Sequence, residues 1–230
     1  MHLVFRLSGD PLRLFNAASD RQGRIISDAV VGGARASYYI REVSKPLCSV
    51  GAQLRPGAAE ALFGVAADEL ADRHTPVEDL WGSRTASIRD QLSSTTVLAE
   101  RLDVLERILT TRVPKLRALH PAVARALTRL RTTTSVHELV EGSGYSHRTF
   151  IELFSRSVGL APKSYCRVLR FQRALRRAAA PGHDPWIDVA IDAGYSDQSH
   201  FNREFREFAG VTPTVYRGVA PAFSHHLPVD

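Results

Sequence analysis

The stretch AGYSDQSHFNREFREFAGVTPTVYRG, residues 193–218, is the second copy of an internal repeat that decides how this chain folds. Gly-Tyr-Ser at 194–196 also occurs at 144–146, and when Ser146 and Asp197 are aligned as helix N-caps, five later positions agree at equal offsets. Those pairs are Phe150 and Phe201, Phe154 and Phe205, Gly159 and Gly210, Pro162 and Pro213, and Tyr165 and Tyr216. Five matches in register indicate one structural unit that the chain builds twice.

Each copy is predicted to be a short helix, a glycine-containing turn and a second, capped helix, which is the helix-turn-helix arrangement. Short apolar helices precede the turns at Val136–Val140 and Trp186–Ile191. Asp184 is the expected N-cap of the latter, with Pro185 at its first helical position. The glycine in each turn lets the chain reverse where a side chain would collide.

The capped helices separate into a core face and a polar face. Phenylalanines at a period of 3.6 residues predict the buried side of each helix. The opposite side carries Arg148 and Glu152 in the first copy, and Gln198, Ser199, Asn202, Arg203 and Arg206 in the second. Arginine fits the acceptor edge of guanine, Gln and Asn fit adenine, and Glu can accept from cytosine. These faces are predicted to enter the major groove of DNA, and the alternative is an ordinary solvated helix face.

A further helix is predicted between the two copies, over Ser164–Ala180. At 1.5 Å per residue this helix spans roughly 25 Å, so it can hold two recognition helices apart. Arginines recur along its length, and Arg170 and Arg173 are expected to contact DNA phosphates unless they extend into water.

Charge is unevenly divided along the chain. Residues 1–100 contain 11 Arg and Lys against 12 Asp and Glu, whereas residues 101–230 contain 19 against 12. A polyanion is the partner that this basic second half favours. The alternative is a solvated surface, because 27 of the 30 basic residues are arginine, as a coding bias would produce.

The repeat and the helix between its copies together resemble the AraC/XylS family of transcriptional regulators over residues 135–218. The resemblance rests on the order Gly-Tyr-Ser, Phe-x-x-x-Phe, Gly-Leu-Ala-Pro-Lys, Arg-Phe-Gln-Arg-Ala-Leu, Trp-Ile-Asp-Val-Ala and Gly-Val-Thr-Pro-x-x-Tyr-Arg. It implies a DNA-binding domain of about seven helices with two helix-turn-helix motifs joined by a long helix. By position it implies base contacts from Arg148, Ile151 and Glu152 in the first motif, and from Gln198, Ser199, His200 and Arg203 in the second.

Two residues of the first motif depart from that family. Glu152 is acidic where basic or amide residues are frequent, and Gly142 weakens the preceding helix. The first motif is therefore expected to be either the more selective or the weaker of the two.

The amino-terminal half is predicted to begin as strands and continue as helices. Short runs rich in β-branched and aromatic residues predict strands at His2–Leu7, Leu12–Asn16, Ile25–Val31, Ser37–Val43 and Ser49–Leu54. The later spacing of Ala, Leu and Glu predicts helices at Ala58–Phe63, Ser83–Ser93, Thr96–Arg112 and Ala122–Arg131. This half also resembles a companion domain of some AraC/XylS regulators, which implies no known ligand. In those relatives further residues precede the position of Met1, so we expect the chain to start inside the domain.

The chain as a whole is predicted to be α+β. A mixed β-then-α amino-terminal domain is followed by an all-α domain with two helix-turn-helix motifs joined by a long helix. We expect a regulatory domain at 1–115, a linker region with a helix at 116–134, the DNA-binding domain at 135–218 and a tail at 219–230. Ser135 and Glu138 are typical of a capping box at the start of the DNA-binding domain.

Composition excludes several other classes of protein. With 44% hydrophobic and 23% charged residues, the chain resembles a soluble globular protein. No run approaches the roughly 18 apolar residues of a membrane span, so we expect a cytoplasmic protein with no membrane partner. Cys48 and Cys166 are too few for a disulfide framework or a thiolate zinc site, and no metal or cofactor is predicted.

We predict a sequence-specific DNA-binding transcription factor, not an enzyme, whose partner is double-stranded DNA. RNA polymerase and a small-molecule effector are the further partners expected, and the oligomeric state is not determined by the sequence. One alternative is a DNA-repair or other enzyme that uses Cys48 as its nucleophile, because some proteins with this DNA-binding fold repair alkylated bases. The other is an architectural protein that binds DNA without sequence preference.

Overall fold

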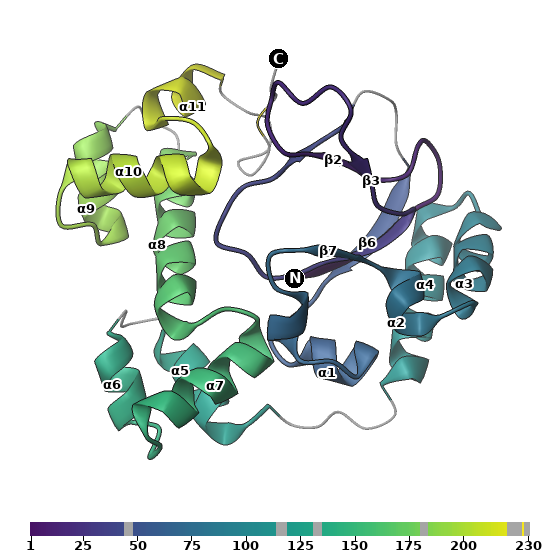
Figure 1. Ribbon diagram of the computed structural model, residues 1–230, viewed down its shortest axis with the longest axis horizontal. Coiled ribbons are helices and arrows are strands. Elements are labelled where there is room, and N and C mark those ends of the chain that lie inside the picture. Colours follow the sequence, from purple (N-terminus) through teal and green to yellow (C-terminus); the bar gives the residue numbers. More distant parts are fainter. Residues whose placement is uncertain (44–47, 114–118, 131–134, 180–183, 220–226, 228–230) are drawn as a thin grey trace. The chain divides into compact units, whose positions relative to one another are not determined.

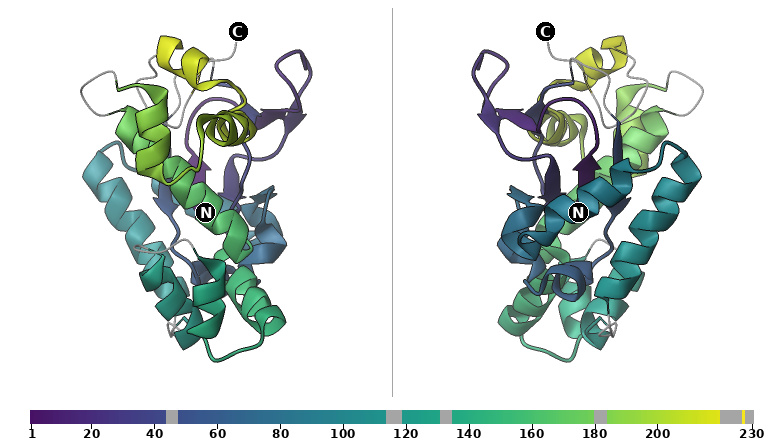
Figure 2. Two further views of the ribbon diagram at one scale, coloured as in Figure 1. Left: turned by 90° about the vertical axis from the view of Figure 1, so that its left-hand side faces the viewer. Right: turned by 90° about the vertical axis from the view of Figure 1, so that its right-hand side faces the viewer.

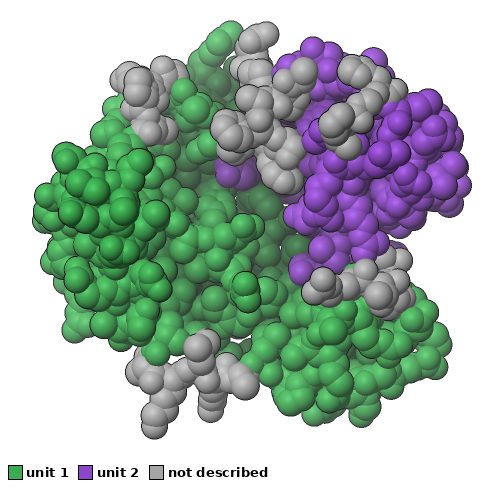
Figure 3. Space-filling view, turned by 180° about the vertical axis from the view of Figure 1, so that it is seen from behind, with its two compact units in different colours: residues 1–35, 40–162 green, residues 36–39, 163–230 purple. Residues whose placement is uncertain are grey.

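The structure is a computed structural model that describes residues 1–43, 48–113, 119–130, 135–179, 184–219 and 227. Its contacts divide the chain into two compact units, which Figure 3 distinguishes by colour. Unit 1 contains residues 1–35 and 40–162, and unit 2 contains residues 36–39 and 163–230. This division does not test the domain boundaries predicted from the sequence, which stay a prediction.

Unit 1 contains two antiparallel sheets. The larger has the strand order β6-β1-β4-β7 and the smaller β3-β2-β5. The strands are β1 His2–Arg6, β2 Arg13–Phe15, β3 Arg24–Ile25, β4 Ala29–Gly32, β5 Ile40–Arg41, β6 Ser49–Gln53 and β7 His74–Pro76. Leu3 pairs with Val31 across β1 and β4, and the side chains alternate between the two faces of the sheet. Leu3, Phe5 and Val31 therefore share one face, and all three are fully buried.

Five helical segments cover that apolar face, and they gather on one side of the larger sheet (Figure 1). They are α1 Ala58–Phe63, the 3-10 helix η1 Ala67–Leu70, α2 Val77–Trp81, α3 Arg84–Ser93 and α4 Leu98–Arg112. Trp81 packs against Phe5 and Phe63, and its indole N–H donates to the Leu62 carbonyl oxygen at 2.9 Å. Leu92 and Leu105 close the same core from α3 and α4. The strands and helices of the first hundred residues thus form one hydrophobic core.

The first helix-turn-helix belongs to unit 1. It consists of α6 Val136–Glu141 and α7 His147–Val158, and α5 Pro121–Arg129 packs beside α7. The carboxyl end of α7 contacts η1 and α1, and the Gly57 amide donates to the Ser157 carbonyl oxygen at 2.8 Å. A Cβ atom on Gly159 would lie 2.8 Å from the Cβ of Ala34 and 3.0 Å from the Ala67 carbonyl oxygen. This close approach fixes the first recognition helix to the amino-terminal fold.

Unit 2 contains the second helix-turn-helix. Its helices are α8 Pro162–Ala178, which starts at the unit boundary, α9 Trp186–Ala193, α10 Gln198–Ala209 and α11 Pro213–Val219. Phe201 and Phe205 are fully buried, and Trp186 and Tyr216 pack their rings against them at centroid distances of 5.4–5.8 Å. Figure 2 shows α8 as one unbroken helix. Within residues 135–218 the structure describes six helices, α6–α11, where the family resemblance implies about seven, and α5 precedes them.

The structure corrects the predicted strands in three places. The strand predicted at Ile25–Val31 is two strands, β3 and β4, because the chain passes between the two sheets around Ser27. The strand predicted at Ser37–Val43 is only the two residues of β5. β7 was not predicted, since it is short and contains Pro76, which is tolerated because β7 lies at the edge of the sheet.

The structure also corrects some helix boundaries. α2 was not predicted, because it has only five residues and no polar N-cap. Pro185 is itself the N-cap of α9, so the helix starts at Trp186 and Asp184 does not cap it. The prediction that Pro185 occupies the first helical position is therefore wrong by one residue.

Replacement of Gly33 tests the close approach of β4 to η1. The Gly33 amide donates to the Arg73 carbonyl oxygen at 3.0 Å, and a Cβ atom on Gly33 would overlap the Leu70 carbonyl oxygen. Gly33→Ala is therefore expected to destabilise unit 1 by about 1–3 kcal/mol in thermal or urea unfolding. Gly218→Ala is the control, because no atom of the described residues lies within 4 Å of a Cβ atom there. Equal losses in both variants would contradict the packing described.

Candidate nucleic-acid interface

Both recognition helices begin at a side-chain cap. Ser146 accepts a hydrogen bond from the Thr149 amide at 3.3 Å, and Asp197 accepts one from the His200 amide at 2.7 Å. The bond from the His200 amide and one from Ser196 hold the pKa of Asp197 below its ordinary value. The predicted N-caps of α7 and α10 are thus confirmed.

The first recognition helix, α7, presents a polar face to solvent. Phe150 and Phe154 are fully buried on its inner side, while Arg148 and Glu152 are exposed on the outer side. Ile151 is half-buried between the two faces. The structure therefore brings together the predicted contacts of the first motif on one accessible surface, with Ile151 at its margin.

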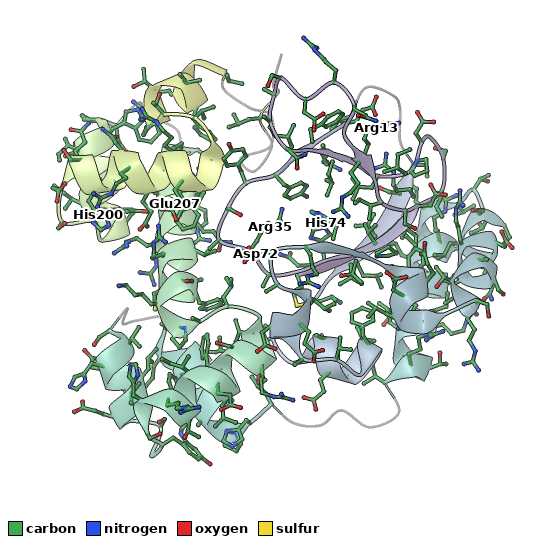
Figure 4. The ribbon with its side chains drawn as sticks, in the orientation of Figure 1. Arg13, Arg35, Asp72, His74, His200 and Glu207 are labelled. Carbon is green, nitrogen blue, oxygen red and sulfur yellow. The ribbon has the colours of Figure 1, made fainter. Side chains whose placement is uncertain are left out.

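The second recognition helix, α10, presents a longer polar face. Its exposed residues include the predicted contacts Gln198, Ser199, Asn202, Arg203 and Arg206, and His200 is half-buried. Four of them, Ser199, Asn202, Arg203 and Arg206, line an open hollow of about 520 Å³ together with Glu207. Figure 4 shows His200 towards the start of α10 and Glu207 towards its end. Guanidinium, amide and hydroxyl groups are the chemistry that reads base edges in the major groove.

A buried carboxylate fastens α10 to α8. Glu204 is 2% exposed, and its carboxylate accepts hydrogen bonds from Arg167 at 2.8 Å and from Arg170 at 3.1 Å. The Tyr195 hydroxyl, from the turn before α10, donates to the same carboxylate at 2.9 Å. Arg167 also pairs with Glu207, one turn further along α10. Two guanidinium groups and one phenol thus satisfy a single buried charge.

Titration of the Glu204 network reflects opposing effects. Burial alone would raise the pKa of Glu204, but the hydrogen bonds from Arg167, Tyr195 and Arg170 outweigh it and leave the pKa below its usual value. Burial and the neighbouring Glu204 charge raise the pKa of Tyr195. The hydrogen bond to Glu207 raises the pKa of Arg167 further above neutrality. At neutral pH these pKa shifts leave Glu204 ionised, Tyr195 a neutral phenol and Arg167 a guanidinium ion.

The two α8 residues predicted to contact phosphate differ in their surroundings. The Arg170 guanidinium forms an ion pair with Glu204 and lies over the Tyr195 ring, 4.6 Å from its centroid. Arg173 is half-buried on the same helix. Arg177, near the end of α8, forms ion pairs with Asp184 and Asp192. The phosphate contacts of Arg170 and Arg173 stay predictions, and the structure gives Arg170 a role within the protein.

The sequence analysis missed the role of Glu204. A signal was present, since Glu204 falls on the same helix face as Phe201 and Phe208, where a solvated carboxylate is not expected. An arginine-rich helix elsewhere in the same domain is the partner that such a buried charge requires.

The two cysteines differ in their surroundings. The Cys48 sulfur accepts a hydrogen bond from Arg101 at 2.9 Å, and Arg101 also donates to the Leu92 and Thr95 carbonyl oxygens. Cys166 is buried on α8, and burial raises the pKa of its thiol. Within the described ranges, no group of three or more His, Cys, Asp or Glu side chains is placed to hold a metal ion. No helix among these residues is long and apolar enough to cross a membrane.

Comparison with known proteins matches the carboxyl-terminal helices. A family model described as a helix-turn-helix domain matches residues 139–218, from within α6 to within α11. Residues 139–218 are an AraC-type helix-turn-helix domain. The AraC-type domain thus contains both capped recognition helices and the Glu204 network between α8 and α10.

Relatives match this chain over the AraC-type domain, and one of them is named as a transcriptional regulator. The invasion protein InvF of Salmonella typhi is 37% identical over 75 residues, which cover 33% of this chain and 34% of InvF. An HTH-type transcriptional regulator of Mycobacterium tuberculosis is 32% identical over 82 residues, covering 36% of this chain and 31% of that protein. The chain therefore matches about a third of the length of these relatives. A solved structure of ToxT from Vibrio cholerae matches 96% of this chain and 89% of its own, with 12% identity and a TM-score of 0.48.

Removal of the Glu204 charge should destabilise unit 2 in a pH-dependent way. Glu204→Gln leaves Arg167 and Arg170 without their buried counter-ion, which should cost about 3 kcal/mol at pH 7. Because the folded-state pKa of Glu204 lies below the unfolded value of about 4.3, its contribution is present above that pH and is lost as pH falls through the folded-state pKa. Urea unfolding should therefore show a smaller difference between the two proteins at pH 3 than at pH 7.

Glu141→Gln is the matched control for this measurement. Glu141 forms an exposed i,i+4 pair with His137, so its charge should contribute little at either pH. A Glu204→Gln protein as stable as wild type at pH 7 would contradict the buried network.

Proposed function

We propose that this protein is a transcription regulator that binds DNA sequence-specifically through two recognition helices, α7 and α10, placed in adjacent major-groove segments. The observation that carries the proposal is the same in both helices. Each has a side-chain cap, buries its aromatic residues and leaves a polar face exposed at the helix N-terminus. A helix of this kind enters the major groove with its first turns against base edges.

Base recognition is divided between the two helices. On α10, Arg203 suits the O6 and N7 acceptors of guanine, while Gln198 and Asn202 suit adenine. On α7, Arg148 offers a second guanine contact and Glu152 accepts from the amino group of cytosine. Glu152 would repel phosphates without such a donor, so it should narrow the choice of sequence at the first motif.

The connection between the motifs limits the form of the binding site. α8 has 17 residues, and at 1.5 Å per residue it spans roughly 25 Å. Adjacent major-groove openings on one side of DNA recur about every 34 Å, so the two helices cannot share one groove segment. Because the faces of α7 and α10 carry different residues, we propose a site of two unlike elements about one helical turn apart.

The remaining assignments follow from the regulator role. We propose residues 1–115 as the regulatory domain, a small-molecule effector as its ligand and RNA polymerase as a further partner. We also propose that the chain has no enzymatic activity, since α7 and α10 each expose a polar face that fits DNA. The relative from Mycobacterium tuberculosis is named as an HTH-type transcriptional regulator, which supports the DNA partner.

Two arginine substitutions test this proposal in binding assays with selected and random DNA. Arg203→Ala should reduce the preference for the selected site about 5-fold to 100-fold, which corresponds to about 1–3 kcal/mol of base discrimination. Arg173→Ala should weaken binding to both DNAs equally and lower the slope of log affinity against log salt by about one phosphate contact.

The outcome that contradicts the proposal is also measurable. Wild-type protein that shows no preference for any sequence over random DNA would support the architectural alternative. Affinity that does not change with salt would exclude DNA as the partner, because phosphate contacts release counter-ions on binding.

A further inference from the structure

The two tyrosines of the repeated Gly-Tyr-Ser have different surroundings. Tyr195, before α10, is 4% exposed and donates to Glu204 at 2.9 Å. Tyr145, before α7, is 43% exposed, and its hydroxyl lies 3.4 Å from the His120 imidazole. The position equivalent to Glu204 in the first copy is Leu153, which has no charge to offer. The repeat therefore keeps the tyrosine, but its hydroxyl forms an exposed hydrogen bond with an imidazole in the first motif and donates to a buried carboxylate in the second.

The Tyr195 contact joins three segments of unit 2. Glu204 lies on α10 itself, Tyr195 on the turn that leads into it, and Arg167 and Arg170 on α8. The same carboxylate lies 3.7 Å from the imidazole of His200, one turn earlier on α10. Arg170 covers the other side of the network by stacking on the Tyr195 ring. Tyr195 and Glu204 are buried, whereas the α10 side chains proposed to contact DNA are exposed or, for His200, half-buried.

We propose that Tyr195 and Glu204 are positioning residues for base recognition: they fix the direction of α10 relative to α8 so that its polar face meets the base edges. This inference rests on the proposed function and names residues that do not touch DNA. Charge-assisted hydrogen bonds have narrow limits of distance and angle, whereas apolar packing such as that of Leu153 permits small rotations.

The size of the effect follows from the length of the helix. α10 has 12 residues and is about 18 Å long, so a rotation of about 10° about its middle moves each end by roughly 1.6 Å. A hydrogen bond to a base edge tolerates only a few tenths of an ångström before it weakens. Loosening the network should therefore reduce base discrimination while the phosphate contacts, which are less demanding, persist.

The test compares Tyr195→Phe with its matched control Tyr145→Phe. For each protein, affinity is measured for DNA containing the selected site and for variants altered in one of its two elements. Tyr195→Phe should lower discrimination at one element about 3-fold to 10-fold and leave the other unchanged. Tyr145→Phe should leave discrimination at both elements as in wild type, and the slope against salt should not change in either protein.

Loss of stability alone cannot produce the expected result. Discrimination is a ratio of two affinities of the same preparation, so the fraction of folded protein cancels. Tyr195→Phe also keeps the size and most of the packing of the side chain, and Glu204→Gln serves as a second variant if it folds. Unchanged discrimination in Tyr195→Phe, or an equal loss at both elements, would overturn the inference. A wild-type protein without sequence preference would instead overturn the proposed function, and this inference with it.

Discussion

Burial of the Glu204 carboxylate is the constraint around which the second helix-turn-helix is arranged. A carboxylate that is 2% exposed must be compensated, because an unpaired buried charge costs several kcal/mol. Arg167 and Arg170 supply that compensation from α8, and Tyr195 supplies it from the turn. The positions of three segments are therefore tied to one group. The aromatic core around Phe201 and Phe205 provides most of the buried apolar surface of this motif. In our proposal the hydrogen bonds to Glu204 set the direction of α10 relative to α8.

The two recognition helices are held in different ways. α7 is fixed at its carboxyl end, where Gly159 allows close approach to Ala34 and Ala67 and the Gly57 amide bonds to Ser157. α10 is fixed at Glu204 and Glu207 by ion pairs with Arg167 and Arg170 of α8. The first motif is thus packed on the amino-terminal fold and the second on the helix that leads to it.

Local patterns were sufficient to predict much of this structure. The range of α1 agrees with its predicted range, and both recognition helices were found, because periodicity, caps and turn glycines act over a few residues. The exposure of Arg148 and Arg203 was predicted for the same reason, since a helix face can be read from spacing.

What the sequence analysis missed depends on contacts between distant segments. β7 exists because it pairs with β4, some 45 residues earlier, and its own three residues carry no strand signal. Arg170 was predicted to contact phosphate. Its pairing with Glu204 was not predicted, because Glu204 lies 34 residues away on another helix. Helical spacing predicts Arg170 on one helix and Glu204 on another, but it does not show that the two helix faces meet.

Selection of bound sites from a random DNA library by the full chain tests the central claim most directly. The account predicts that the enriched sequences contain two unlike short elements whose centres are separated by about 10 base pairs, in one fixed orientation. A palindrome, a single element, or no enrichment over the starting library would contradict recognition by α7 and α10 within one chain.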